Sequence, residues 1–276
     1  AKLAANDVSI GAATIQASVS DLFGVPAIDG SVNGRAIAAG GITVDTLDAR
    51  ASRTGDATAF DATAALANRT NVALAGNLAP LDKGYRLALD RAELTQGQLR
   101  ARLAQPTAVA ISGDTVSLDA VQFDVGGGRI SATGSAGSKL DIALEVSALP
   151  LSIANAIAPD LGLAGTLNGS GRITGSASDP SASFTIAGSG VSAAAISEFG
   201  ITPMQFSARG SYARQSVTLE SASAQGAGGL QLSASGRVPF NGRGLAVDVQ
   251  GSAPLALGNR FVADRGGQLS GTATLN

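Results

Sequence analysis

The chain has 276 residues, a formal net charge of −2 and neither histidine nor cysteine. These absences remove the commonest general base, the imidazole and thiolate metal ligands, thiol catalysis and disulfides. The near-neutral charge and the 4% share of aromatic residues disfavour a nucleic-acid-binding surface. We therefore expect a protein that is not an enzyme, that carries no cofactor or metal, and that does not bind nucleic acid.

The residue composition favours strands over helices. Alanine occurs 53 times and glycine 36 times, whereas glutamate occurs 4 times and lysine 3 times. Glutamate and lysine are good helix formers on exposed surfaces, so their scarcity disfavours a helical protein. With so much Ala and Gly and few aromatic residues, filling two facing apolar layers is difficult.

Apolar residues alternate with polar or small ones along most of the chain, which is typical of strands with one apolar and one solvated face. Turn-forming segments rich in glycine separate the alternating runs, and they recur often enough to predict an antiparallel meander of about 20 strands. In chain order, the clearest alternating runs are residues 85–90, 115–119, 140–146, 230–238 and 245–249. The clearest turn segments are residues 124–129, 134–139, 226–229 and 241–244.

Two segments have a helical rather than an alternating pattern. Residues 152–158 place Ile153 and Ile157 at helical spacing behind Ser152, and Pro159 ends the pattern. Residues 192–198 are a weaker candidate. We expect one or two short helical turns.

Part of the sequence is repeated. Pro150–Asn155, followed by Asp160 and Gly162, returns as Pro254–Asn259, followed by Asp264 and Gly266. Upstream, residues 115–119 resemble residues 216–220. We expect one continuous β segment with approximate repeat modules at 1–110, 111–215 and 216–276, the last incomplete. Since the chain ends within its pattern, we also expect an excerpt of a larger protein.

A single long sheet that bends along its length satisfies this composition better than a packed sandwich. Its apolar side would line a narrow trough, and Gly and Ala in the strands would ease the curvature. The competing interpretation is that the same side chains form an ordinary core between two sheet layers. The residues that we expect to line the trough are Leu87, Leu89, Val116, Leu118, Ile130, Leu140, Ile142, Leu144, Val146, Leu230, Leu232, Leu245, Val247 and Val249.

The sequence also resembles a known family. The segments Leu149–Asn155, Pro159–Gly175 and Ala177–Pro180 are similar to the TamB family, the translocation and assembly module proteins of Gram-negative bacteria within the AsmA-like group. This resemblance implies an all-β fold: an elongated antiparallel meander sheet curled into a taco-like groove with an apolar interior.

The resemblance further implies a periplasmic protein, anchored in the inner membrane through a part absent here. Its groove would carry phospholipid between the inner and outer membranes, and its partner would be a TamA-like barrel of the outer membrane. An alternative is a periplasmic scaffold that assists assembly and secretion of outer-membrane proteins, such as autotransporters, by β-augmentation. No catalytic residue is implied.

Two sharper interpretations of individual motifs are disfavoured. Gly126–Gly128 lacks the lysine and hydroxyl residue of a phosphate-binding loop, so a hairpin turn is expected. Asp45 with Asp48, or Asp119 with Asp124, could be a catalytic carboxylate pair, but aspartate on the solvated face of a strand is far commoner.

Overall fold

The computed structural model describes residues 3–5, 8–20, 27–39, 42–156, 158–197, 199–240, 244–262 and 266–275. These residues form nineteen strands and a few short helical segments, so the predicted all-β fold is confirmed. None of their helices is long and apolar enough to cross a membrane. The predicted turn at residues 241–244 lies largely outside the described residues.

Contacts divide the chain into two units. Unit 1 comprises residues 1–125 and 131–137, and unit 2 comprises residues 126–130 and 138–276. Strand β11 (Gly128–Ala136) contributes residues to both units.

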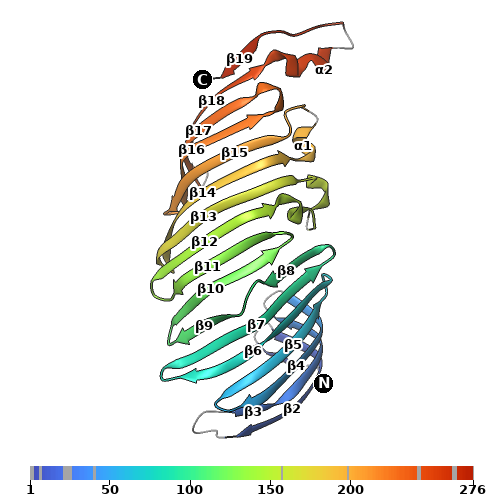
Figure 1. Ribbon diagram of the computed structural model, residues 1–276, viewed down its shortest axis with the longest axis vertical. Coiled ribbons are helices and arrows are strands. Elements are labelled where there is room, and N and C mark those ends of the chain that lie inside the picture. Colours follow the sequence, from blue (N-terminus) through green and yellow to red (C-terminus); the bar gives the residue numbers. More distant parts are fainter. Residues whose placement is uncertain are drawn as a thin grey trace. The chain divides into compact units, whose positions relative to one another are not determined.

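Unit 1 is an antiparallel meander in which each strand from β1 to β7 pairs with the next. Its sheet curves strongly, and Figure 1 draws the blue strands partly behind the teal ones. The strands are β1 (Leu3–Ala5), β2 (Val8–Ser20), β3 (Ala27–Ala39), β4 (Ile42–Thr54), β5 (Ala57–Leu66), β6 (Thr70–Leu81), β7 (Gly84–Gln96), β8 (Leu99–Leu103), β9 (Thr107–Ser112) and β10 (Thr115–Val125).

Strands β8 and β9 share one position between β7 and β10. Both pair with β7 and both pair with β10, because the chain is interrupted between them at residues 104–106. Pro106 has no N–H to donate to the ladder, which explains the interruption. The amide of Ala104 still donates to the carbonyl of Gln122 at 2.8 Å, so the start of the interrupting segment remains hydrogen-bonded to β10.

Unit 2 continues the same architecture. Each strand from β12 to β19 pairs antiparallel with the next, so the predicted meander is confirmed in both units. The strands are β12 (Leu140–Pro150), β13 (Ala164–Ser176), β14 (Asp179–Ser192), β15 (Met204–Ala213), β16 (Ser216–Gly226), β17 (Gln231–Pro239), β18 (Ala246–Pro254) and β19 (Thr272–Leu275).

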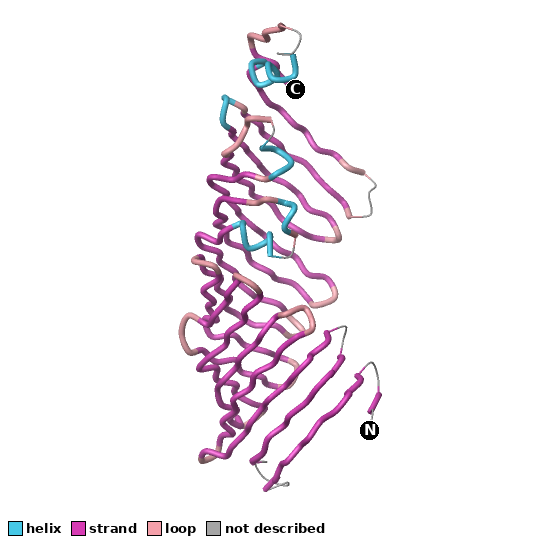
Figure 2. Tube along the Cα trace, turned by 90° about the vertical axis from the view of Figure 1, so that its right-hand side faces the viewer, coloured by secondary structure: helices cyan, strands magenta, loops and turns pink. Residues whose placement is uncertain are grey.

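Every second connection of unit 2 contains helical turns, and these connections lie at one end of the strands (Figures 1 and 2). The helical turns predicted at 152–158 and 192–198 are confirmed by η1 and α1, although η1 is a 3₁₀ helix. The helical segments are η1 (Leu151–Ala156), η2 (Pro159–Leu161), α1 (Ala194–Ser197), η3 (Ala227–Gly229), η4 (Leu255–Gly258) and α2 (Asn259–Val262).

The sequence repeat corresponds to a repeated loop closure. The Asn155 side chain accepts from the Leu163 amide at 2.9 Å and donates to its carbonyl at 2.8 Å. Asn259, the equivalent residue, accepts from the Leu269 amide. The glycines that follow, Gly165 and Gly271, have φ values of 101° and 102°. In both copies, an asparagine therefore closes the loop just before a left-handed glycine leads into the next strand.

We expect Asn155→Ala to lower the free energy of unfolding by about 1–3 kcal/mol, because two backbone groups of the half-buried Leu163 lose their partners. Urea denaturation measures this change. Asn155→Asp keeps only the acceptor and should fall between alanine and the wild type. The control is Asn71→Ala, since Asn71 is exposed in β6. Equal destabilisation by Asn71→Ala and Asn155→Ala would contradict the role of the loop closure.

Candidate functional site

One side of the sheet in unit 2 is apolar. In several strands, half-buried apolar residues alternate with exposed polar ones, as in β13, where Leu167 and Ile173 alternate with Asn168 and Arg172. The register of the ladders aligns these residues into rows across the strands. We call this side the apolar face of unit 2. Its larger members include Leu140, Ile142, Leu144, Val146, Leu167, Ile173, Phe184, Ile186, Phe206, Tyr212, Val217, Leu219, Leu232, Val247 and Val249.

Large and small residues alternate along one row of this face, whereas other rows pair large residues directly, as Ile142 with Ile173. In the alternating row, every pair of neighbouring strands from β12 to β18 places a large side chain directly opposite a glycine. Its members, in order, are Leu144, Gly171, Phe184, Gly210, Leu219, Gly236 and Val247. Within this row, each large side chain therefore has glycine, rather than another large side chain, directly opposite.

The glycines leave room that neighbouring side chains occupy. A Cβ added to Gly210 would lie 2.8 Å from Cζ of Phe184, and one added to Gly251 would lie 2.5 Å from Cδ2 of Leu232. A Cβ at Gly188 would overlap the ring of Phe206. Aromatic and aliphatic side chains thus lie over the glycine backbone of the next strand and shield its hydrogen bonds.

The apolar face is open. Leu144, Leu232, Val247 and Val249 remain 36–39% exposed, and no large side chain of the described residues is fully buried. The competing prediction of a core sealed between two layers is therefore wrong for the described residues.

Unit 1 also has an apolar face, in which large residues oppose one another along one row. This row crosses its strands through Leu78, Leu87, Val109 and Leu118. Leu78 is 37% exposed. Here too a glycine separates larger residues, because Gly76 lies between Phe60 and Leu89 in the neighbouring row.

The structure brings most of the predicted lining residues onto these two faces. Leu87, Leu89, Val116 and Leu118 lie on the apolar face of unit 1. The unit 2 members are Leu140, Ile142, Leu144, Val146, Leu232, Val247 and Val249.

Three predicted residues lie elsewhere. Leu230 precedes β17, and its carbonyl accepts from the Gly226 amide at 2.9 Å, so it belongs to the turn. Leu245 precedes β18 and is 66% exposed. Ile130 is half-buried in β11, the strand whose residues are divided between the units.

Phe184, Ile186, Phe206 and Leu219 belong to the face but were not predicted. Their strands contain many Gly, Ser and Thr residues, so a search for runs of large apolar residues passes over them. A signal that could have found the two phenylalanines is a large residue four positions before a glycine, which puts both on the same side of a strand, as in Phe184 to Gly188 or Phe206 to Gly210.

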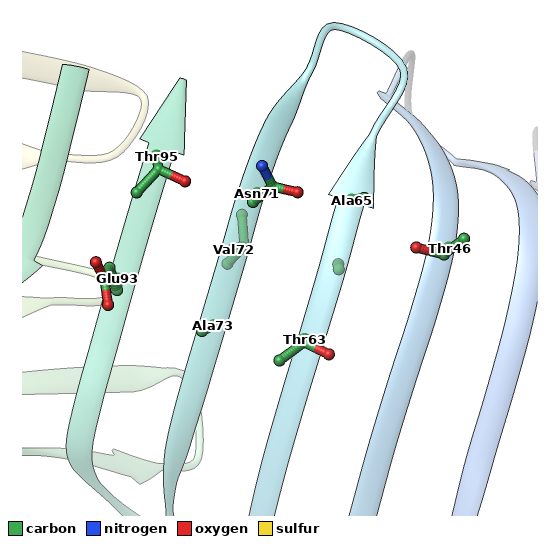
Figure 3. A pocket seen from close by; sticks show the side chains of 9 residues that line it. Thr46, Thr63, Ala65, Asn71, Val72, Ala73, Glu93 and Thr95 are labelled. Carbon is green, nitrogen blue, oxygen red and sulfur yellow. The ribbon is translucent and has the colours of Figure 1, made fainter. Parts of the chain in front are cut away.

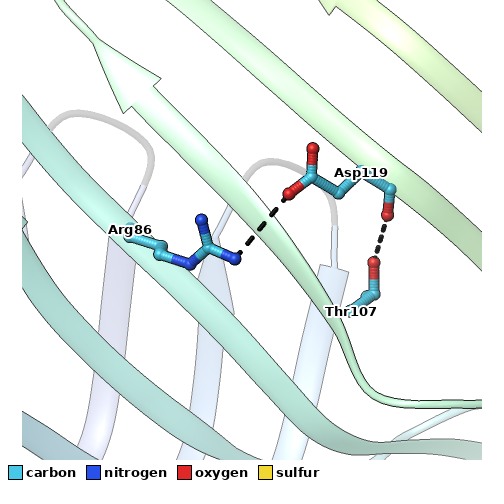
Figure 4. Close-up of polar contacts among 3 residues, drawn as sticks. All are labelled: Arg86, Thr107 and Asp119. Atoms are coloured by element: carbon cyan, nitrogen blue, oxygen red, sulfur yellow. Dashed lines mark hydrogen bonds and ion pairs between the residues drawn. The ribbon is translucent and has the colours of Figure 1, made fainter.

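The opposite side of each sheet is polar and carries the ion pairs. Arg172 contacts Asp141 at 2.6 Å in unit 2, and Arg91 contacts Asp61 at 2.9 Å in unit 1. Arg86 lies 3.8 Å from Asp119, whose carbonyl accepts from the Thr107 hydroxyl (Figure 4). These pairs are exposed, so each stabilises the fold by at most about 1 kcal/mol.

The polar side also carries shallow open hollows. One of about 390 Å³ in unit 1 is lined mainly by Thr46, Thr63, Asn71, Glu93 and Thr95 from β4 to β7 (Figure 3). A second, of about 320 Å³ in unit 2, is lined mainly by serine, asparagine and glutamine side chains. The first hollow also contains the charged Glu93, and both include small or apolar residues such as Ala65 and Ala187.

The two aspartate pairs considered above were disfavoured as catalytic groups. In the described part of the chain no three metal-ligating side chains gather. Asp119 faces Arg86, and Asp124 lies 3.9 Å from Arg102. These contacts agree with carboxylates on a solvated strand face.

Fold and site together define a single-layer antiparallel β-sheet protein with an exposed apolar face. No family model, curated protein or solved structure matches the chain. The resemblance to the TamB family therefore stays a prediction.

We expect Gly188→Ala to lower the free energy of unfolding by about 1–3 kcal/mol, because the new methyl group displaces the Phe206 ring. The matched control is Gly171→Ala on the same face, where the nearest atom to an added Cβ is the Ser183 carbonyl oxygen at 3.2 Å. That change should stay within about 1 kcal/mol of the wild type, since alanine also restricts the unfolded chain. Urea denaturation measures the free energy of unfolding of both variants. Equal decreases would contradict the packing of Phe206 over Gly188.

Proposed function

We propose that the chain is part of a periplasmic, TamB-like protein whose apolar sheet face conducts phospholipid acyl chains between the inner and outer membranes. The observation that carries this proposal is the open apolar face. Side chains such as Leu144 and Val247 project from one side of a single-layer sheet and remain about one-third exposed. Exposed apolar patches beyond a few hundred Å² mark interaction sites in proteins.

The energetic requirement for lipid conduction favours such a face. Transferring about 15 methylenes of an acyl chain into water costs about 12 kcal/mol, at about 0.8 kcal/mol each. An apolar face lowers this cost wherever it covers the chain. On a sheet with one open side, the lipid head group can stay in water while the acyl chain lies against the protein.

The chemistry of the face favours passage over tight, selective binding. Its side chains are Leu, Ile, Val, Phe, Ala and Gly, with Tyr212 contributing a hydroxyl. Most of these groups offer contact without directional hydrogen bonds, so neighbouring positions along a row hold an acyl chain about equally well. A partner such as a TamA-like outer-membrane barrel would receive the lipid through parts of the protein outside this chain.

We expect a photo-crosslinking residue at Val247 to capture phospholipid, and one at Asp248 not to do so. The two positions are neighbours in β18, but Val247 pairs with Gly236 on the apolar face and Asp248 pairs with Ser235 on the polar side. Leu144 and Glu145 in β12 form a second matched pair. The measurement is the yield of lipid adduct after irradiation in the presence of phospholipid.

Equal capture at both members of each pair would contradict the proposal. If all four positions instead capture unfolded outer-membrane protein and no lipid, the scaffold function is favoured. The comparison between adjacent residues removes differences in expression, folding and accessibility that would affect distant positions.

We also expect Val249→Asp to weaken the binding of a fluorescent phospholipid by about tenfold, because a carboxylate replaces contact with roughly two methylenes. Val249 is 39% exposed, so the fold tolerates the charge. Gln250→Asp adds the same charge on the polar side and should leave binding unchanged. A fluorescence titration measures both; equal weakening would indicate a general effect of charge.

A further inference from the structure

A hollow of about 270 Å³ on the polar side of unit 2 contains opposite charges. It lies over β13 to β16, and its polar lining consists of Ser170, Arg172, Ser183, Thr185, Arg209 and Glu220. Arg209 alternates with Ala208 and Gly210, so it projects away from the apolar face. The hollow is therefore separate from the surface proposed to hold acyl chains.

Two of its charged groups are not neutralised within the protein. Arg172 is held by Asp141, whose two carboxylate oxygens lie 2.6 and 2.8 Å from the same guanidinium nitrogen. By contrast, neither Arg209 nor Glu220 has a side-chain hydrogen bond or an ion pair with any described residue. The hollow thus presents a guanidinium and a carboxylate that do not pair with each other.

Glu220 lies at a β-bulge, an irregularity in the pairing of β15 with β16. The register between β15 and β16 shifts here, so that Arg209 pairs with Ser221 while Gly210 pairs with Leu219. Glu220 is the extra residue of this bulge. Bulges redirect a side chain from the position that regular pairing would give it, and they are enriched beside binding sites. Both free charges therefore lie at the one irregular point between these two strands.

We infer that this hollow binds a compact zwitterion that carries a phosphate and an ammonium group. The Arg209 guanidinium and the Ser183 and Thr185 hydroxyls can donate to the phosphate oxygens, and the Glu220 carboxylate accepts from the ammonium. Charge-assisted hydrogen bonds are the stronger class, so these two residues supply most of the affinity. The same chemistry occurs in free phosphoethanolamine and in a phosphatidylethanolamine head group.

The test is an NMR titration of the chain with phosphoethanolamine and, separately, with inorganic phosphate. Arg209→Gln should weaken both ligands about tenfold, because each loses a charge-assisted bond. Glu220→Gln should weaken phosphoethanolamine about tenfold and leave phosphate unchanged or tighter. The control is Asp248→Asn, which removes a carboxylate from the same side outside the hollow and should change neither.

Equal responses of the two ligands to Glu220→Gln, or the absence of saturable shifts around Arg209, would overturn the inference. Vesicles identify the source of the ligand. Binding to phosphatidylethanolamine but not phosphatidylglycerol vesicles, lost in both variants, indicates the lipid head group; binding of the soluble ligand alone indicates a free zwitterion. Val249→Asp on the apolar face should leave phosphoethanolamine binding intact, so this test and that of acyl-chain conduction can fail separately.

Discussion

The main constraint on unit 2 is that one sheet layer must shield its own backbone. A sandwich covers an apolar face with a second sheet, but here the cover comes from within the layer. Phe206 lies over Gly188 and Leu232 over Gly251, so a large side chain of one strand protects the hydrogen bonds of the next. This arrangement needs small residues opposite large ones, which accounts for the abundance of glycine and alanine.

On the polar side, long charged side chains likewise extend over a small residue of the neighbouring strand. Arg91 reaches Asp61 across the intervening strand β6, where the residue between them is Ala75. A larger side chain at Ala75 would separate the guanidinium from the carboxylate. Small residues thus have a role on both sides of the sheet. On the apolar side they leave room for large side chains to lie against the backbone, and on the polar side they allow an ion pair to form across the strand between its partners.

The sequence was sufficient for the fold class, because alternation and turn chemistry are local properties. Runs such as 140–146 predicted strands. The repeated segments that contain Asn155 and Asn259 correspond to two loops, each of which is closed by hydrogen bonding of its asparagine side chain to the backbone. Leu230 was misplaced because the strand boundary depends on a glycine turn. Phe184 and Phe206 were missed because their role depends on cross-strand register. The bulge at Glu220 likewise depends on pairing between strands, which no single run of residues reveals.

In the described residues, the open face and the lack of a sealed core have the same origin. A face covered by large side chains throughout would attract a second layer, since burial of each such side chain favours association by about 1.5–3 kcal/mol. Replacing every second residue of a row by glycine or alanine lowers that gain while keeping the surface apolar. The row from Leu144 to Val247 therefore combines two properties: it is apolar, as the proposed conduction of acyl chains requires, and it offers little protruding side-chain volume to pack tightly against another rigid sheet.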